Sequence, residues 1–408
     1  MKKIVPVLLG ADLNAYSMAM SFADAYGVQS YVLARDKLAI TSSSRFVRYG
    51  VVEGLDGREK ALTALIELAN RHEGDRLILV PCADWYTEMT ENARDELRGR
   101  YFFNLPTFGV WKRVSDKASF AELLSEYGIA HPRTVILQKS SDAVSAASKE
   151  LRPPFVIKPA DSTEYWRHPF VKMRKTYFAY TLSEAREIAK MIFESGYGGK
   201  VILQQFFGDS VTRGADASVL TTYSDISGRV IRAVLGDVLL EDRSPTATGN
   251  YSAIVTRELD GISHSLINML NSIGYTGIAN FDILRQGSKR VCLELNARQG
   301  RSFDYVRMAG VNLARLLVGD MNGEKRKCRL EYSDGVWSSV PWRTVRAFAP
   351  NKELLARAEL LRRGGLLFSP YRHKLKESIG REAFVAVHLF REAKKFKREI
   401  RGTKSVAE

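Results

Sequence analysis

The chain has 408 residues, which is long enough for two or three domains with a substantial buried core. Its composition is that of a folded protein, with 45% hydrophobic and 26% charged residues, and no apolar run reaches the ~18 residues that a membrane-spanning helix needs. The first residues have the pattern of a strand rather than that of a signal peptide, so we expect a cytoplasmic protein.

The net charge of +15 favours anionic partners, such as nucleotides, anionic metabolites or a membrane surface. No RNA-binding signature or zinc-finger spacing accompanies this charge, so we do not expect a nucleic-acid partner. The wide and uneven spacing of the three cysteines predicts neither a disulfide framework nor a zinc site.

Strand and helix patterns alternate over residues 1–110. The expected strands are 4–9, 28–33 and 76–80, and the expected helices are 15–26, 57–72 and 84–98. This alternation is typical of a doubly wound parallel sheet in an α/β domain. The first turn, Gly-Ala-Asp-Leu-Asn, lacks the second and third glycines of a dinucleotide-binding fingerprint, which argues against NAD.

Two polar residues follow the first expected strand, at the edge of the sheet where ligands of such domains bind. They are Asp12 and Asn14, which we predict to be substrate contacts. The alternative is that one of them only caps the helix that follows.

Residues 111–320 contain a second set of elements. The expected helices are 115–128, with Ser115 as its N-cap, 183–196, 260–274 and 303–318, and the expected strands are 134–137, 155–159, 201–208 (meeting a turn), 217–223 and 229–235. The polar stretch 241–251, which includes Asn250, is either an active-site loop that folds over the substrate or an ordinary surface loop.

Two short runs near the end of this region predict a metal site. Asp282 and Glu294 each lie in an apolar, strand-like run, and a polar turn at 287–289 separates the runs. A hairpin would bring these acids and Asn296 together as three oxygen ligands, which suit Mg²⁺. Arg298 could then meet a phosphoryl group with a bidentate fork. The alternative is an ordinary hairpin with acids on its solvent face.

Residues 321–408 form a basic extension that we expect to be helical. Apolar residues recur at three- and four-residue steps over 376–401, beside a cluster of lysines and arginines, which predicts a basic amphipathic helix. Such a helix either contacts an anionic membrane at its inner face or packs on its own protein with the basic face in solvent.

The order of four features resembles the ATP-grasp superfamily. They are a lysine at a helix start (Lys117), a lysine that ends a strand (Lys158), the hinge-like run Gln204-Gln205-Phe206-Phe207, and the acidic hairpin. The resemblance implies an α/β fold of the ATP-grasp type over residues 111–320, with lobe one at 111–205 and lobe two at 206–320 closing on ATP. The preceding residues match the usual N-terminal domain of that superfamily.

The resemblance also implies roles for these residues. The two lysines would touch the ATP phosphates, the backbone of the hinge-like run would bind adenine, and the hairpin residues would hold two Mg²⁺ ions. Asp209 is a candidate for the ribose hydroxyls. Two departures stand out, because Gln204 replaces the common glutamate and no glycine-rich loop follows Lys158. Ser162 and Thr163 could still donate hydrogen bonds to the phosphates there.

Six further runs resemble the D-aspartate ligases of Gram-positive cell-wall synthesis. They are 8–18, 158–165, 239–242, 249–251, 274–282 and 296–302. This narrower resemblance implies that D-aspartate is joined, through an acyl phosphate, to the side-chain amine of the diamino acid in the peptidoglycan stem peptide. The acceptor would be UDP-N-acetylmuramyl (UDP-MurNAc) pentapeptide or its lipid-linked form.

In that chemistry we expect Arg298 to stabilise the transferring phosphoryl group and Arg301 to hold a substrate carboxylate, although Arg301 could instead form an ion pair at a helix start. Two other functions stay open. One is a ligase for a related amino acid or another acceptor, in capsule synthesis or peptide conjugation, and the other is a non-catalytic ATP-binding module. The sequence fixes neither the chirality of the amino acid nor whether the chain forms a homodimer.

Overall fold

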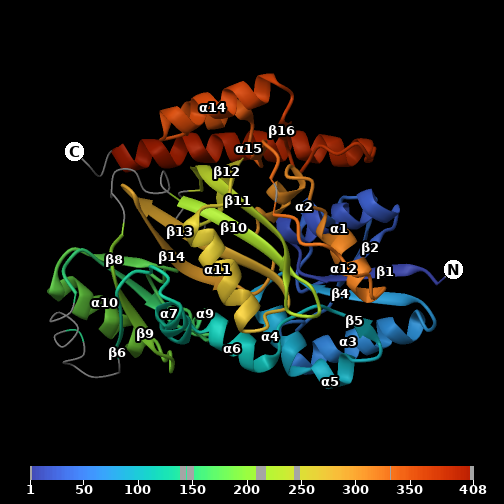
Figure 1. Cartoon of the computed structure of the whole chain (residues 1–408), viewed down its shortest axis with the longest axis horizontal. Helices are drawn as coiled ribbons and strands as arrows, with labels where there is room; N and C mark the ends of the chain where they lie inside the picture. Colours follow the sequence, from blue (N-terminus) through green and yellow to red (C-terminus); the bar gives the residue numbers. More distant parts are fainter. Residues whose placement is uncertain are drawn as a thin grey trace.

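The computed structural model describes residues 2–137, 144, 151–207, 217–242, 249–330 and 332–404. In Figure 1 the N-terminal domain lies at one side, a smaller lobe at the other, and a large sheet between them. Two long C-terminal helices run across the top of this arrangement. The three sheets of the described residues correspond to these three parts.

The N-terminal sheet is parallel, with strand order β3-β2-β1-β4-β5, so the predicted doubly wound domain is confirmed. The strands are β1 (Ile4–Leu9), β2 (Ser30–Ala34), β3 (Val47–Val51), β4 (Arg76–Pro81) and β5 (Tyr101–Phe102). The central strands are apolar throughout because helices cover both faces of the sheet. These helices are α1 (Leu13–Tyr26), α2 (Ala39–Ser42), α3 (Arg58–Arg71), α4 (Asp84–Asn92) and α5 (Arg94–Leu97).

Lobe one is a four-stranded antiparallel sheet of order β6-β9-β7-β8. Its strands are β6 (Thr134–Leu137), β7 (Phe155–Pro159), β8 (Tyr177–Ala179) and β9 (Val201–Gln205). The amphipathic helix α10 (Leu182–Glu194) buries its apolar side against this sheet. The short helix α9 (Ser162–Trp166) follows β7 and occupies the place where many ATP-grasp proteins have a glycine-rich loop.

Two helices replace the single one predicted to begin at Ser115. Helix α6 (Phe108–Ser115) ends there, and α7 (Lys117–Glu126) begins after Asp116. The N-cap is therefore Asp116, because its extended backbone breaks the helix and its carboxylate accepts the backbone N–H of Ser119 at 2.9 Å. Lys117 keeps its predicted place at a helix start.

The large central sheet has the order β14-β13-β10-β11-β12-β15-β16. Its strands are β10 (Ala217–Ser224), β11 (Val230–Glu241), β12 (Tyr251–Arg257), β13 (Gly277–Gln286), β14 (Lys289–Asn296), β15 (Val336–Ser338) and β16 (Leu367–Phe368). One face packs on α11 (Gly261–Ser272), and the other shares a core with the N-terminal domain. The sheet therefore holds the acidic hairpin against the domain that carries Asp12 and Asn14.

The C-terminal third departs from the prediction in two ways. The helix expected over 303–318 is split into a 3₁₀ turn (Phe303–Arg307) and α12 (Leu313–Met321), because Gly310 has φ +78° and Asn312 caps a new helix. The extension also gives β15 and β16 to the central sheet, besides α13 (Trp342–Phe348), α14 (Lys352–Arg363) and α15 (Ile379–Lys404).

Candidate active site

The predicted acidic hairpin forms between β13 and β14. Its register pairs Asp282 with Glu294 and Asn280 with Asn296, so the two acids are direct cross-strand neighbours. A register shift follows Asp282, where the regular ladder is interrupted. Asp282, Glu294 and Asn296 all face one cavity of 430 Å³, as predicted for a metal site.

This cavity lies where the N-terminal domain, lobe one and the central sheet meet. It brings together eight residues that we predict to be functional: Asp12, Asn14, Asn250, Asp282, Glu294, Asn296, Arg298 and Arg301. It also contains residues that the sequence analysis did not select, which are Cys82, Ala83, Asp84, Trp85, Lys175, Gly249, Tyr251, Asn280, Gly300 and Ser302. Segments from positions 12 to 302 of the chain therefore build one site.

The two hairpin carboxylates are partly buried and have opposite pKa shifts. Burial and the neighbouring charge of Glu294 raise the pKa of Asp282, whose Oδ1 accepts the Tyr251 hydroxyl at 3.0 Å. Burial alone would raise the pKa of Glu294, but the charges of Lys175, Lys158 and Lys117 outweigh it and lower that pKa. The pair thus faces three ammonium groups.

The lysines come from lobe one. Lys117 donates from Nζ to the Ala160 carbonyl at 3.1 Å, and Lys158 lies on β7. Burial lowers the pKa of Lys158, and the charges of Lys117 and Lys175 lower it further. Lys175 was not predicted, because it lies in the irregular stretch before β8, where no strand or helix pattern marks it. Its only sequence signal is the local basic run 172–175.

The donor set at the hairpin fits Mg²⁺. Two carboxylates and an amide oxygen are ligands that Mg²⁺ takes, usually together with substrate phosphates. The close pair of partly buried carboxylates, with the pKa of Asp282 raised, is the arrangement that a divalent cation would neutralise. Across the part of the chain that the structure describes, no group of three or more His, Cys, Asp and Glu side chains has a metal-binding arrangement. Two carboxylates and one amide oxygen leave coordination positions that a ligand's phosphates would fill.

Asp12 and Asn14 each line the cavity and also form hydrogen bonds within the protein. Asp12 caps α1 by accepting the backbone N–H groups of Asn14 and Ala15, at 3.1 and 3.4 Å, and also lines the cavity. Burial raises the pKa of Asp12, and the charges of Arg301 and Arg298 oppose that rise. The Asn14 amide donates to the carbonyls of Cys82 and Gln299, while its Oδ1 is buried without a hydrogen-bond partner in the structure. Asp12 therefore caps the helix, as the alternative interpretation states, and also lines the cavity, while its contact with a substrate stays a prediction.

The guanidinium fork of Arg298 faces a protein carboxylate, with one hydrogen bond from Nη2 and one ion-pair contact from Nε. Its Nε and Nη2 lie 2.7 and 2.8 Å from the two oxygens of Asp84, at the start of α4, and Nη2 also reaches Asn296 at 3.3 Å. The sequence does not single out Asp84, because an acidic residue at the start of an expected helix is explained by its favourable interaction with the helix dipole. Arg301, in contrast, has no hydrogen-bond or ion-pair partner among the described residues, so its charge is available to an anionic ligand.

The residues predicted to bind adenine lie at the end of β9 and just after it, and they do not line this cavity. The backbone N–H groups of Gln205 and Phe206 donate to the carbonyls of Arg133 and Pro154, at 2.9 and 3.1 Å. Gln204 donates to the Thr134 hydroxyl at 3.1 Å. Phe207 ends the described part of this hinge-like run, and Asp209 lies outside the described residues. Ser162 and Thr163 begin α9, but their side chains are not among those described.

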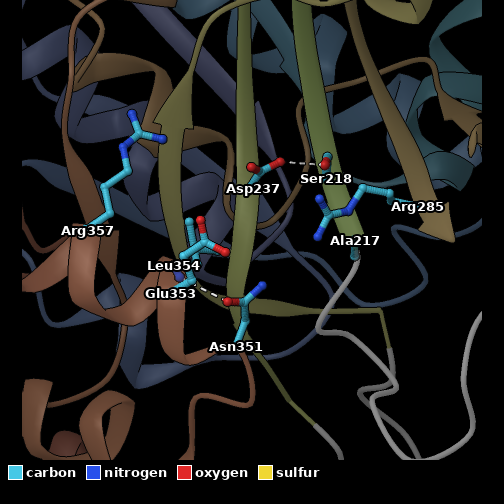
Figure 2. Close-up of a pocket in the computed structure, with 8 residues that line it drawn as sticks. All are labelled: Ala217, Ser218, Asp237, Arg285, Asn351, Glu353, Leu354 and Arg357. Atoms are coloured by element: carbon cyan, nitrogen blue, oxygen red, sulfur yellow. Dashed lines mark hydrogen bonds between the residues drawn. The ribbon is translucent and has the colours of Figure 1, made fainter. Parts of the chain in front are cut away.

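A second, smaller cavity of 210 Å³ lies on the opposite face of the central sheet, beside α14 (Figure 2). Asp237 pairs with Ser218 in the ladder, one residue out of phase with Asp282, so the two acids point to opposite faces. Asp237 accepts from the Ser218 hydroxyl at 2.7 Å and pairs with Arg257 at 3.3 Å. This cavity contains no predicted functional residue, so the 430 Å³ cavity is the candidate site.

No family model matches the chain. A D-aspartate ligase from Enterococcus faecium (strain Aus0004) is 32% identical to it over 367 residues, which covers 86% of each protein. The structure of an N5-carboxyaminoimidazole ribonucleotide synthetase, solved as an ADP complex, has a TM-score of 0.62 at 13% identity and covers 97% of both chains. The biotin carboxylase domain of Hydrogenobacter thermophilus 2-oxoglutarate carboxylase has a TM-score of 0.63 at 14% identity, covering 81% of this chain and 73% of that one. These structures confirm the ATP-grasp fold.

The fork between Arg298 and Asp84 predicts a measurable coupling. We expect Arg298→Lys and Asp84→Asn each to lower the free energy of unfolding, and the double variant to lose less than the sum, because either change weakens the same hydrogen bond and ion pair. The coupling should be about 1 kcal/mol, since Asp84 is half exposed and the pair is partly screened by solvent.

Chemical denaturation of the four proteins measures this coupling. The same cycle with Arg113→Lys and Glu126→Gln, an exposed pair in the α6–α7 region, should give a coupling close to zero. Additive losses at Arg298 and Asp84 would contradict a fork that holds the two segments together.

Proposed function

Because the chain belongs to the D-aspartate ligase family, we propose that it is an ADP-forming ligase that joins D-aspartate to the side-chain amine of the diamino acid in the peptidoglycan stem peptide. The acceptor in this proposal is UDP-MurNAc pentapeptide or its lipid-linked form. The observation that carries the proposal is the partly buried Asp282–Glu294 pair facing the charges of Lys175, Lys158 and Lys117. A non-catalytic module would need neither the close acids nor the lysines.

The nucleotide would lie between lobe one and the acidic hairpin. Lys117 and Lys158 are placed to neutralise phosphate oxygens, and Lys175 adds a third positive charge on the same side. Asp282, Glu294 and Asn296 would hold two Mg²⁺ ions, whose charge would neutralise the ATP phosphates. Adenine would bind at the end of β9, beside the Gln204–Phe207 segment.

The amino acid would lie toward the N-terminal domain. D-aspartate carries two carboxylates and an ammonium group, so it needs both signs of charge in its pocket. Arg301 supplies a cation for the carboxylate that does not react, and the Asp12 carboxylate is placed for the ammonium group. Asn14 presents a buried acceptor without a partner, and Asn250 adds a polar side chain on the other wall.

The reaction would proceed in two steps. The second carboxylate of D-aspartate attacks the γ-phosphorus of ATP, the bond to the β-phosphate oxygen breaks, and ADP and an acyl phosphate form. The acceptor amine, after losing its proton, then attacks the acyl carbon, and inorganic phosphate leaves as the amide forms. Lys117, Lys158 and Arg298 offset negative charge during phosphoryl transfer, which depends mainly on positioning and electrostatics.

Release of inorganic phosphate tests this function. With ATP and Mg²⁺, we expect release to require both D-aspartate and UDP-MurNAc pentapeptide, because the acyl phosphate turns over only when an amine accepts it. Arg301→Met should raise the KM for D-aspartate by about tenfold or more, through the loss of a charge-assisted bond.

The panel should include L-aspartate, D-glutamate and D-alanine, with and without the acceptor. Phosphate release with a different amino acid would change the assigned substrate but would still support an ATP-dependent ligase. No release with any pair would contradict the proposed function. Arg113→Met, a change at an exposed arginine far along α6, is the matched control for Arg301→Met.

We also propose that α15 contacts an anionic membrane with its outer face. Its inner face packs on the protein through Val385, Ala393 and Phe396. The alternative that the helix packs on its own protein is therefore correct for this face. The outer face keeps Ile379 90% exposed and Phe390 54% exposed, and Lys394 and Lys397 are exposed within two turns of Phe390. Apolar and basic groups together on one exposed face suit an anionic lipid surface. No described helix is long and apolar enough to cross a membrane.

Vesicle sedimentation tests the contact with the membrane. The protein should bind vesicles that contain about 30% phosphatidylglycerol and should be released by high salt, because about 1 kcal/mol of attraction is expected for each basic residue near the surface. Phe390→Ser should weaken binding without changing thermal stability. Ile226→Ser, at an exposed isoleucine in the β10–β11 turn, should leave vesicle binding unchanged. Equal binding to neutral vesicles, or no effect of Phe390→Ser, would contradict this contact.

A further inference from the structure

Helix α15 reaches the edge of the candidate site through one buried ion pair. Lys395 donates from Nζ to Oδ2 of Asp242 at 2.6 Å, and the Asp242 side chain is only 4% exposed. The Lys395 side chain is 27% exposed, whereas its neighbours Lys394 and Lys397 face solvent. Loss of Lys395 would remove a close cation from the buried Asp242 carboxylate, which costs free energy.

Asp242 directly follows β11 and is hydrogen-bonded to Asn250, which lines the cavity. Its backbone N–H donates to the Asn250 carbonyl at 2.8 Å, and the preceding Glu241 pairs with Tyr251 across the β11–β12 ladder. The Glu241 carboxylate also accepts the backbone N–H of Gly249 at 2.7 Å. The position of Asp242 therefore helps to set the position of residues 249–251 at the start of β12.

Residues 249–251 form one wall of the candidate site. Gly249, Asn250 and Tyr251 line the 430 Å³ cavity, and the Tyr251 hydroxyl donates to Asp282, one of the two hairpin acids. A shift of this wall would move the Asn250 side chain, which we propose to contact the substrate. Asp242, which pairs with Lys395, is hydrogen-bonded through its backbone to Asn250 of this wall.

Helix α15 is itself held at both ends, so Lys395 is a fixed support. Near its start, the buried Arg381 donates to the Ser43 hydroxyl at 2.8 Å and to the Ile40 carbonyl, in the N-terminal domain. Near its other end, Phe396 is buried and stacks on Phe348 of α13, with ring centroids 6.3 Å apart. The helix thus connects the N-terminal domain with the far end of the central sheet.

We propose that Lys395 is a positioning residue for the substrate cavity, which acts through Asp242 to hold residues 249–251 against the acidic hairpin. The kinetic part of this inference rests on the proposed function, whereas the structural part does not. A lysine that only stabilised the fold would affect every measurement equally.

Hydrogen exchange tests the structural part without any substrate. In Lys395→Met we expect the backbone amides of Asp242 and Gly249 to exchange about tenfold faster or more, because both donate within the segment that the ion pair supports. Lys395→Arg should restore slow exchange, and Lys394→Met is the matched control on the exposed face. Unchanged exchange at both amides in Lys395→Met would overturn the inference.

Steady-state kinetics test the positioning role. We expect Lys395→Met to raise the KM for D-aspartate or for the acceptor by about fivefold or more, while the dissociation constant for Mg-ADP changes by less than about twofold. Lys395→Arg should recover most of the loss. An equal fall in thermal stability, nucleotide binding and turnover, without recovery in the arginine variant, would show a structural role only. If the unaltered protein turns over no substrate, the proposed function fails, and the exchange experiment still decides the role of Lys395.

Discussion

The structure depends on keeping two partly buried carboxylates, Asp282 and Glu294, side by side. The β13–β14 register makes them direct neighbours, and removal from solvent together with the charge of Glu294 raises the pKa of Asp282. This arrangement is unfavourable for stability by itself. It is sustained by the positive charges of lobe one and by the Tyr251 hydroxyl, and a bound metal–nucleotide complex would complete the compensation. Sites that bind charge tightly often carry such a cost.

Three parts of the chain must meet for that compensation to occur. The N-terminal domain shares a hydrophobic core with the central sheet, and Asn104 links them by donating to Tyr223, Asp320 and the Ser224 carbonyl. The fork between Arg298 and Asp84 adds a polar link at the rim of the site. Lobe one has a separate core and contributes its lysines. Opposite charges on the facing surfaces would favour closure around a ligand.

Much of this could be predicted from the sequence, because periodicity and order along the chain are local signals. The parallel N-terminal sheet and the acidic hairpin follow from alternation and turn residues, and a family resemblance connects the lysines to the hairpin. Lys175 and Asp84 could not be predicted, since each becomes functional only through contacts with distant segments. The same is true of Lys395, which the sequence shows only as one of several basic residues on a helix.

Calorimetric titration with ADP, with and without Mg²⁺, tests most directly whether the acidic pair binds a metal–nucleotide complex. We expect tight binding only with Mg²⁺, and a loss of about tenfold or more in Asp282→Asn, whose folded state should be as stable as the unaltered protein or more so. Weaker binding together with unchanged or higher stability is expected because the substitution removes a metal ligand and also removes a charge that repels Glu294. Equal affinity for ADP without Mg²⁺, or unchanged affinity for Mg-ADP in Asp282→Asn, would contradict this assignment of the site.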